Sequence, residues 1–567
     1  MAINYIKGAE QDTYWHGKMN LTVGLCESMG VPDIFNKYLD SGYGRKPDIP
    51  YGVLAEMLIV NICSTHRPLY RFKDFYTDVD LDGIFHCEMD LNKITDDRFG
   101  LLLDKVYAAG ARKIFGEISS NAFTMHNITV KNINYDTTSM VMWGEYDTPE
   151  GKLGAISINF GHSKQKREDK KQIKLGVGTA NGVIIDAKVL SGNKDDKTYN
   201  NENLDDVNSV IERFDMDKDN FYYIADSALF TKENLEKAKG KIKFITRMPD
   251  NTLVAQKLID DTLSDRNSMK EVFFENAQGK KVQYFLSEKT AVYNDMNLKC
   301  AVCYSTSLEE TKKKTIEKKV NKEVELIEKL VKKYNKRTFA CAKDANKEID
   351  LVIKKDLDKL RFFNYNITLA GKEKKAVGRP STKETDREKQ FKYEVSIEFI
   401  RDELKVAKII EKECTFVLCS NDLSITGEAI LLEYKTQSSI EKKFQQLKSP
   451  HFVNSLYLNT PERIEALTYM ILISMMMLSV SEYAVRSGLN NEEAFVIGPG
   501  QLKMKKPTLK SILEIFDKVP MKVFIVDGKK QRALGRPFSD SQRKILKYLL
   551  IPEEVFCWNV KTCVCDS

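Results

Sequence analysis

Between residues 132 and 247 the sequence alternates short apolar stretches with amphipathic ones, and this alternation constrains the fold more than any other feature. Asn181-Gly182 lies between two apolar stretches and is a strong signal for a two-residue hairpin turn. Alternation of strands with helices is typical of α/β proteins, so the sequence predicts a mixed sheet with flanking helices. We expect strands at 132–142, 153–161, 173–178, 183–190, 221–226 and 243–247, and helices at 201–214 and 231–239.

Two aspartates stand out on these predicted strands. Asp136 lies in the middle of the first strand, where an acidic residue is disfavoured and is costly to bury unless it is paired or coordinated. Asp226 closes an apolar strand, and open α/β sheets place reactive groups at strand ends. Each aspartate taken singly also fits a strand-end cap or a salt-bridged surface residue. Together with one helix glutamate, the pair fits the ligands of two Mg²⁺ ions.

Residues 434–448 are predicted to form an amphipathic helix with a chemically unusual face. On a continuous helix, residues seven apart return to nearly the same angle, which places Tyr434, Glu441 and Lys448 on one stripe beside Gln437. A carboxylate that can bind a metal is thus flanked by groups that can bind phosphate. The alternative is an ordinary helix with a solvated charged face. The separate apolar stripe that would dock the helix comprises Ile440, Phe444 and Leu447.

Composition places the chain among soluble globular proteins of several domains. The net charge of the 567 residues is only +7, but lysines are clustered, which favours a polyanionic partner modestly. The eleven cysteines lack regular spacing and indicate a reducing cytosol, and Cys300-x-x-Cys303 fits buried core thiols better than a zinc site. The apolar run 466–480 is shorter than a membrane span needs, so we expect a core helix and no membrane partner.

Changes of pattern along the chain indicate its organisation. A helical N-terminal region gives way to strands near residue 130, and a long charged helix at 308–335 carries a narrow apolar stripe amid many lysines. That helix either packs on one side only or lies along an anion. The N-terminal region is interpreted as a small helical domain. A more specific hypothesis is that this domain recognises the DNA ends. The predicted domains are 1–127, 128–249, 250–424, 425–490 and 491–567.

Several motifs occur in the order found in one known family. Together they resemble insertion-sequence transposases of the DDE type, in the group marked by a Tyr–Arg–Glu–Lys signature, over residues 95–490. Gln437 stands where that family has arginine, and glutamine can donate hydrogen bonds to a phosphate but brings no charge. The motifs are Asn134–Thr138, Asn159–Lys164 with Arg167, Ser191–Asp195, Ile224–Leu229, Phe244–Pro249 and Tyr434–Lys448.

The resemblance implies a fold and a set of site residues. The fold would be a ribonuclease-H-like core, 128–249 and 425–490, interrupted by the α+β insertion domain 250–424. The implied catalytic and metal-binding triad is Asp136, Asp226 and Glu441, holding two Mg²⁺ ions, which Mn²⁺ is expected to be able to replace. The DNA contacts would come from Tyr434, Gln437 and Lys448, and from Lys164 and Arg167 in a basic loop between two core strands.

The predicted function follows from these residues and the resemblance. We expect a DNA transposase that binds the ends of its element and catalyses strand cleavage and strand transfer, as a homodimer on DNA in the prokaryotic cytoplasm. Double-stranded DNA, both element ends and target, would be its partner, and a DNA hairpin intermediate fits the family. The alternatives are a nuclease of the same fold that cuts without joining and a DNA-binding protein that has lost catalysis.

Overall fold

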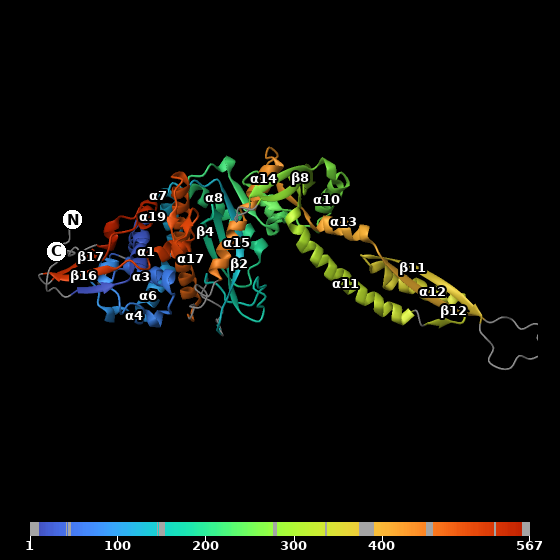
Figure 1. The fold of residues 1–567 in the computed structure, drawn as a ribbon, viewed down its shortest axis with the longest axis horizontal. Helices are drawn as coiled ribbons and strands as arrows, with labels where there is room; N and C mark the ends of the chain where they lie inside the picture. The colour runs from blue at the N-terminus through green and yellow to red at the C-terminus, as the bar shows by residue number, and fades with distance from the viewer. Residues whose placement is uncertain are drawn as a thin grey trace, which may run out of the picture. The chain divides into compact units, whose positions relative to one another are not determined.

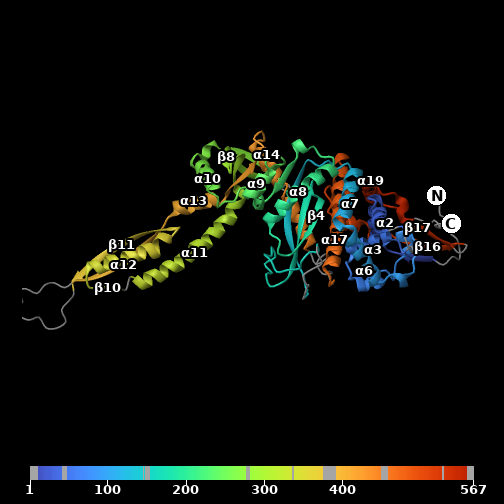
Figure 2. The same cartoon turned by 180° about the vertical axis from the view of Figure 1, so that it is seen from behind.

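The computed structural model describes residues 11–40, 42, 47–144, 146, 154–275, 281–334, 337–373, 391–448, 458–526 and 529–557. Figures 1 and 2 show the fold from opposite sides. The chain divides into two compact units. The first unit comprises Met1–Thr246 and Glu433–Ser567, and the second comprises Arg247–Leu432. The second unit is therefore inserted into the sequence of the first.

Helices dominate residues 17–125 of the first unit, as the sequence predicts. The most apolar of them, α3, is buried over most of its length and forms the centre of this helical layer. Helix α6 begins with Asp96 and Asp97, whose charges favour a helix N-terminus. The elements are β1 (Gln11–Tyr14), α1 (Gly17–Ser28), α2 (Val31–Leu39), α3 (Tyr51–Ser64), α4 (Phe72–Phe75), α5 (Leu81–Phe85), α6 (Asp96–Ala109) and α7 (Ala111–Met125).

A mixed sheet follows the helical region, in the order β4-β3-β2-β5-β6 within the first unit. β2 pairs with β5 and β5 with β6 in parallel, whereas β3 is antiparallel to both β2 and β4. This arrangement confirms the mixed α/β class expected from the sequence, and its strand order and directions fit the expected ribonuclease-H-like core. The strands are β2 (Asn132–Val141), β3 (Gln172–Ala180), β4 (Val183–Leu190), β5 (Tyr222–Ala225) and β6 (Lys243–Arg247).

One strand prediction is right for a clear local reason, and a neighbouring one is wrong. Asn181 and Gly182 both have positive φ, 53° and 76°, as the tight turn between β3 and β4 requires. By contrast, the expected strand at 153–161 is absent from its described part, which contributes only an isolated bridge between Asn159 and Gln172. β4 pairs with β3 only from Lys174 onward, so β3 leaves a short free edge at Gln172, and Asn159 forms its bridge there.

Helix α17 is the central helix of the first unit. It begins at Pro461, as predicted, and contacts α3, α6, α7 and β4, so that it lies between the helical layer and the sheet (Figure 1). Among the described residues it alone is long and apolar enough to cross a membrane, yet 94% of its most apolar window is buried inside the protein. α17 spans Pro461–Asn491, and the other helices around the sheet are α8 (Asp196–Arg213), α9 (Lys232–Ala238) and α15 (Ser438–Leu447).

The C-terminal segment returns to the beginning of the chain. β1 pairs with β16, and β16 pairs with β17, in a three-stranded antiparallel sheet. A buried ion pair between Asp80 and Arg532 ties the same two regions together. The elements are β14 (Val496–Ile497), β15 (Lys503–Met504), α18 (Leu509–Phe516), β16 (Met521–Val526), β17 (Lys529–Leu534) and α19 (Asp540–Leu549).

The second unit contains two antiparallel sheets and several charged helices. One sheet has the order β13-β9-β8-β7 within this unit, and the other has the order β10-β12-β11. Helix α14 crosses from this unit into the first at Glu433. The elements are α10 (Leu253–Ser264), β7 (Lys270–Glu275), β8 (Lys281–Tyr293), β9 (Met296–Ser305), α11 (Glu309–Tyr334), β10 (Thr338–Phe339), α12 (Ala342–Lys355), β11 (Phe363–Glu373), β12 (Phe391–Arg401), α13 (Glu403–Glu413), β13 (Thr415–Ser420) and α14 (Gly427–Lys435).

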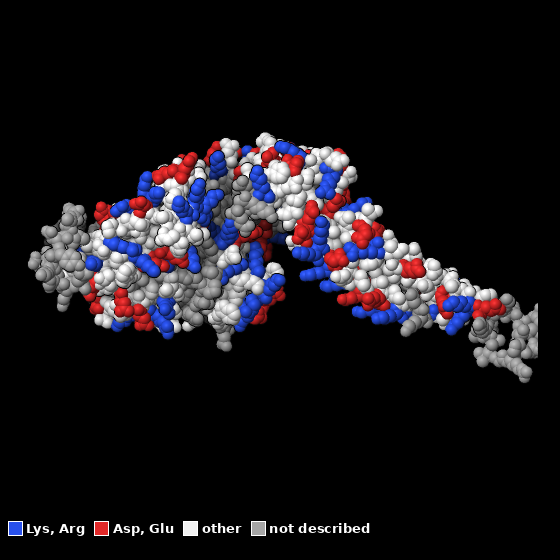
Figure 3. All heavy atoms as spheres, in the orientation of Figure 1, with Lys and Arg blue, Asp and Glu red and all other residues white. Residues whose placement is uncertain are grey.

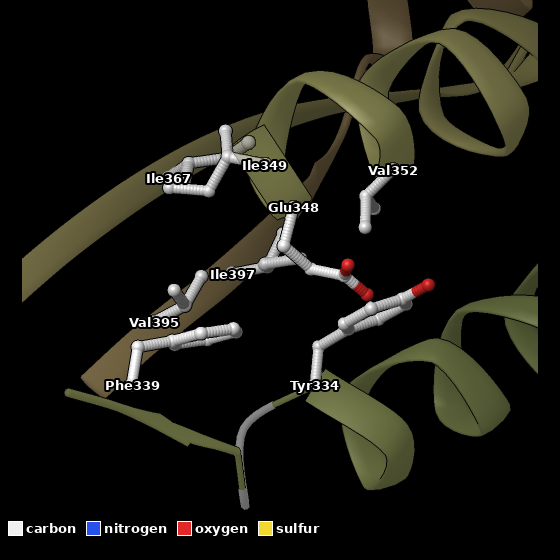
Figure 4. A pocket seen from close by; sticks show the side chains of 8 residues that line it. All are labelled: Tyr334, Phe339, Glu348, Ile349, Val352, Ile367, Val395 and Ile397. Atoms are coloured by element: carbon white, nitrogen blue, oxygen red, sulfur yellow. The ribbon is translucent and has the colours of Figure 1, made fainter. Parts of the chain in front are cut away.

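A small cavity lies between α12, the end of α11 and the sheet β10-β12-β11 (Figure 4). The only charged side chain in its lining, Glu348, forms an ion pair with Arg337. The cavity is therefore part of an apolar core and not a polar ligand site. The lining residues are Tyr334, Phe339, Glu348, Ile349, Val352, Ile367, Val395 and Ile397.

The two cysteines of the Cys300-x-x-Cys303 motif behave as core residues. Both are buried thiols on β9, as the sequence predicts. Burial raises the pKa of the Cys300 thiol to about 12, which keeps it protonated and unreactive.

Candidate active site

The parallel pairing of β2 with β5 brings the two strand aspartates together. Tyr135 lies opposite Ala225 in the register, so Asp136 and Asp226 are the next residues on two neighbouring strands. β5 ends at Ala225, and the Asp226 carboxylate accepts a hydrogen bond from the backbone N–H of Ala228 at 3.0 Å. The hydroxyl of Thr246, on β6, donates to the Asp226 carbonyl at 2.7 Å. The main chain alone thus fixes the spacing of the two aspartates.

The Asp136 side chain is largely buried, with 18% of its surface exposed. The pKa of Asp136 is raised to about 6, mainly by burial and also by the neighbouring charge of Asp226, while Lys164 acts in the opposite direction. The Asp136 carboxylate accepts a hydrogen bond from the backbone N–H of Thr137 at 2.7 Å. A close carboxylate pair of this kind is stabilised by a shared cation. The pair therefore has the chemistry of a binding site for a divalent metal ion.

Lys164 supplies a cation beside Asp136. Its backbone N–H donates to the hydroxyl of Ser139 on β2, which places the residue over the strand. Its ammonium donates to the Thr137 carbonyl at 2.6 Å and to Asp136 at 3.2 Å, and it lies 3.5 Å from Asp196. Burial works to lower the pKa of Lys164, but Asp136 and Asp196 outweigh it and raise the pKa above its usual value. Lys164, predicted to contact DNA, is thus part of the carboxylate cluster.

Asp196 is a member of this cluster that the sequence did not reveal. It lies in the first turn of α8, accepts a hydrogen bond from the Thr137 hydroxyl at 2.7 Å, and pairs with Lys174 at 3.1 Å. Although burial acts in the opposite direction, Lys164, Thr137 and Lys174 lower the pKa of Asp196. The available signal was two consecutive aspartates at a helix start, because only Asp195 caps α8 and Asp196 is left for other partners.

The segment 434–448 is not the single helix that was predicted. α14 ends at Lys435 and α15 begins at Ser438, with a turn at Thr436 and Gln437 between them. The seven-residue stripe is therefore divided, since Tyr434 lies on α14, Glu441 on α15, and Lys448 just beyond α15.

A side-chain contact accompanies this break. The Asn134 amide on β2 donates to the Thr436 hydroxyl at 2.8 Å, and that hydroxyl donates to the Glu433 carbonyl at 2.6 Å. In the turn, the N–H of Gln437 bonds the Tyr434 carbonyl three residues back rather than four. The predicted apolar stripe of α15 is confirmed, since Ile440, Phe444 and Leu447 are all buried.

α15 packs on β2 and β3, with the Glu441 side chain exposed to solvent. Within the described part of the chain, no three Asp, Glu, His or Cys side chains are arranged to hold one metal ion. The structure thus brings Asp136 and Asp226 together but does not bring Glu441 to them. Lys448 lies close enough to this region to be affected by its charges. Burial and the nearby Lys164 lower the pKa of Lys448, and Asp136 partly offsets them.

Three predicted DNA contacts remain. Arg167 is engaged away from the carboxylates, and Tyr434 and Gln437 are only partly exposed. Arg167 forms two hydrogen bonds with Asp169, at 2.7 and 2.8 Å, and its guanidinium lies 5.0 Å from the ring centre of the exposed Trp143. Tyr434 and Gln437 are half-buried. The basic loop thus presents Lys164 to the aspartates and Arg167 to a separate aromatic surface.

Two family models match parts of the chain. A family model described as a transposase DDE domain matches residues 146–477, and one described as a domain of unknown function, DUF4277, matches residues 16–120. The first match starts after Asp136 and includes Asp226 and Glu441. No protein with curated annotation matches the chain.

Two solved structures are similar to parts of the fold at low identity. One is the piggyBac transposase in a cryo-EM synaptic complex with hairpin DNA, with 9% identity and a TM-score of 0.37 over 90% of this chain and 83% of that chain. The other is the Mos1 transposase in a paired-end complex with the left transposon end, with 10% identity and a TM-score of 0.14 over 35% of this chain and 59% of that chain.

Proposed function

The chain belongs to the family of transposases with a DDE domain, and on that premise we propose that it cuts DNA at the ends of its element and joins them to target DNA by metal-dependent phosphoryl transfer. In the first stage, water attacks the phosphodiester at an element end and frees a 3′-hydroxyl. In the second, that hydroxyl attacks a target phosphodiester and displaces the target's own 3′-oxygen. Both stages are in-line displacements at phosphorus, and neither requires a covalent enzyme–DNA intermediate.

The carboxylate pair fits a divalent cation. Asp136 and Asp226 are adjacent, and their mutual repulsion contributes to the raised pKa of Asp136. Magnesium typically binds one or two carboxylates together with substrate phosphates. Mg²⁺ or Mn²⁺ held there would increase the acidity of the attacking hydroxyl and stabilise the leaving oxygen. Because the pKa of Asp136 is about 6, its carboxylate is mostly ionised at neutral pH and able to act as a ligand.

We propose Glu441 as the third acidic ligand. It follows the turn at Thr436 and Gln437, on a helix that packs against β2 and β3. The Glu441 carboxylate is exposed and does not lie with the two aspartates. For it to act as a ligand, α15 or the Glu441 side chain has to move towards the aspartates when DNA and metal bind. The DDE family match, which includes Glu441 and Asp226, supports this role.

The cations around the aspartates would receive DNA phosphates. Lys164 lies against Asp136, and Lys448 is close enough to both residues for their charges to affect its pKa. Two ammonium groups next to a carboxylate pair allow a polyanion to approach it. We propose that Tyr434 and Gln437 donate neutral hydrogen bonds to phosphates of the DNA strand that Lys164 and Lys448 contact. We propose Arg167 as a contact farther along the DNA. Tyr434 acts as a phosphate contact and not as a nucleophile.

Two ends must be brought together before joining, so we propose a homodimer as the active species on DNA. The substrates are double-stranded element ends and target DNA, in the cytoplasm of a prokaryote. The observation that carries the proposal is the side-by-side placement of Asp136 and Asp226 in a chain of this family.

The experiment is a cleavage and joining assay with paired end DNA, a target duplex and Mg²⁺. Asp226→Asn and Glu441→Gln should each reduce cleavage by at least about 1000-fold, a loss of roughly 4 kcal/mol of transition-state stabilisation. Both variants should still bind end DNA. Asp219→Asn, at an exposed aspartate of the same unit, is the matched control and should cleave like the parent protein.

Two outcomes would overturn parts of this proposal. Unchanged cleavage by Asp226→Asn or Glu441→Gln would remove that residue from the site. Cleavage without any joined product, under conditions in which both ends and target are present, would leave a nuclease of the same fold.

A further inference from the structure

Helix α11 in the second unit has three chemically distinct faces. Its apolar face is buried against the neighbouring elements, with Ile316 and Val320 in one cluster with Phe362 and Val406. Farther along, Tyr334 joins the core around α12. This face holds the helix in place, and it accounts for the narrow apolar stripe seen in the sequence.

Two acidic residues of α11, Glu317 and Glu323, make contacts within the second unit. Glu317 forms two hydrogen bonds with Arg401, at 2.9 and 3.0 Å. The Glu323 carboxylate accepts the backbone N–H groups of Arg361 and Phe362, at 2.8 and 3.0 Å. These acids therefore have partners and do not neutralise the lysines on the opposite side of the helix.

Six exposed lysines make up the third face, which we call the lysine face. At 3.6 residues per turn they fall within an arc of about 100°, opposite the buried stripe. One acid, Glu325, lies in the same arc. Figure 3 shows lysine and arginine side chains, with acidic side chains among them, over the part of the molecule that contains this helix. The lysine face consists of Lys314, Lys318, Lys322, Lys329, Lys332 and Lys333.

Most of these lysines have no partner among the described residues. For all but Lys333, the structure shows no ion pair or hydrogen bond of the ammonium within the described part of the chain. The ammonium of Lys333 lies 4.7 Å from the ring centre of Tyr334. By comparison, lysines on the flanks of the same helix are paired, Lys312 and Lys319 both with Glu413. The positive charge of the lysine face is thus directed at solvent.

We propose that the lysine face binds the sugar–phosphate backbone of double-stranded DNA without reading its base sequence. The face extends about 28 Å along the helix axis, and duplex DNA carries about one negative charge per 1.7 Å of its own axis. A lysine ammonium is a compact, flexible point charge that suits phosphate contacts, which position a duplex but carry no sequence information. This inference rests on the proposed function, since a transposase must hold DNA on either side of the cut.

The test compares three versions of the full-length protein. The first carries Lys318→Ala, Lys322→Ala and Lys329→Ala, and the second carries arginine at the same three positions. The third carries Lys343→Ala, Lys347→Ala and Lys354→Ala, which removes three exposed lysines from α12 in the same unit. Binding is measured by fluorescence anisotropy with two labelled duplexes over a range of salt concentrations. One duplex carries the element's end sequence, taken from the DNA flanking the gene, and the other an unrelated sequence.

The alanine triple on α11 should raise the Kd for both duplexes by about tenfold or more. The slope of log K against log salt should fall in magnitude by up to about 2.7, which is roughly 0.9 for each phosphate that the protein no longer neutralises. The arginine triple should bind like the parent protein, because the charge is kept. The α12 triple should change neither the Kd nor the slope substantially.

Three results would overturn the proposal. They are an unchanged salt slope in the α11 alanine triple, an equal loss in the α12 triple, or a loss confined to the end duplex. Circular dichroism of each variant shows whether the fold is retained, and the arginine triple separates loss of charge from loss of structure. If the parent protein binds both duplexes but cleaves neither, the proposed function fails while the lysine face stands. If it cleaves and the alanine triple binds normally, the lysine face alone fails.

Discussion

Lys164 acts as a counter-ion at the carboxylate pair. Its ammonium contacts Asp136 and lies near Asp196, so it balances negative charge that a metal would otherwise balance. When a metal binds Asp136, Lys164 is attracted less strongly to that residue but keeps its ion pair with Asp196. We therefore expect Lys164 to stay in the site and become available to a phosphate, which reconciles its observed position with its predicted role in DNA binding.

A second acid with a raised pKa lies far from this chemistry, on α17. Burial raises the pKa of Glu465 to about 7, and the neighbouring Glu462 contributes. The folded protein therefore binds more protons than the unfolded chain between about pH 4.5 and 7, and stability falls as the pH rises through that window. Replacing Glu465 with glutamine should raise the free energy of unfolding at pH 8 by up to about 3 kcal/mol.

The measurement is urea denaturation of the parent protein and Glu465→Gln at pH 4.5 and pH 8. The gain at pH 8 should disappear at pH 4.5, where the glutamate is already protonated in the folded state. An equal difference at both pH values would show that the substitution acts through packing and not through charge.

At the scale of elements, the break between α14 and α15 depends on a contact between distant parts of the chain. Asn134 is almost fully buried on β2, and its partner Thr436 lies 302 residues later. Removing the hydroxyl with Thr436→Val should leave the Asn134 amide without its acceptor and destabilise the protein by about 1–2 kcal/mol. Cleavage should fall as well, because the turn that positions Gln437 and Glu441 loses its tether to the sheet.

Thr436→Ser is the matched control, because it keeps the hydroxyl and should restore both stability and cleavage. DNA binding should be similar in the two variants. If Thr436→Val cleaves end DNA as fast as Thr436→Ser, the contact does not position α15 for catalysis.

The same contact explains what the sequence could and could not predict. The turn at Asn181 and Gly182, the strand before Asp226 and the apolar stripe of α15 carry strong local signals, and all were predicted. The break at Thr436 accompanies a contact with a residue 302 positions away, which local periodicity cannot reveal. The place of Asp196 in the carboxylate cluster was not predicted for the same reason. It depends on contacts with Lys164 and Thr137, which come from other elements.

The absent strand at 153–161 has a different cause. Its apolar pattern is suitable for a strand, but β4 occupies the edge of β3 from Lys174 onward and leaves Asn159 only a bridge to Gln172. Sequence patterns report what a segment prefers locally, whereas the number of free edges depends on the completed sheet.

At the scale of the whole molecule, the first unit is closed by contacts between its two ends. The Asp80–Arg532 pair is almost fully buried, and a Cβ atom at Gly83 would overlap both side chains. Asp80→Asn should destabilise the protein by about 3–5 kcal/mol, because it leaves the Arg532 charge buried without its counter-ion. Denaturant unfolding of the full chain at pH 7 measures this loss.

The paired control is Asp80→Leu combined with Arg532→Met, which removes both charges. It should recover most of the stability, since a buried ion pair contributes little net free energy relative to apolar side chains of similar volume. A double variant as unstable as Asp80→Asn would show that the hydrogen-bond geometry, and not charge balance, is what matters there.

The pairing of β1 with β16 also sets a time at which the protein can finish folding. The two strands are roughly 510 residues apart in the sequence, so at typical synthesis rates of about 5–20 residues per second the first strand waits roughly half a minute to two minutes for its partner. During that interval the N-terminal helices also lack α17, the element that covers them. We therefore expect nascent chains to expose apolar surface until late in synthesis, so that a ribosome stalled before α17 would release an aggregation-prone polypeptide.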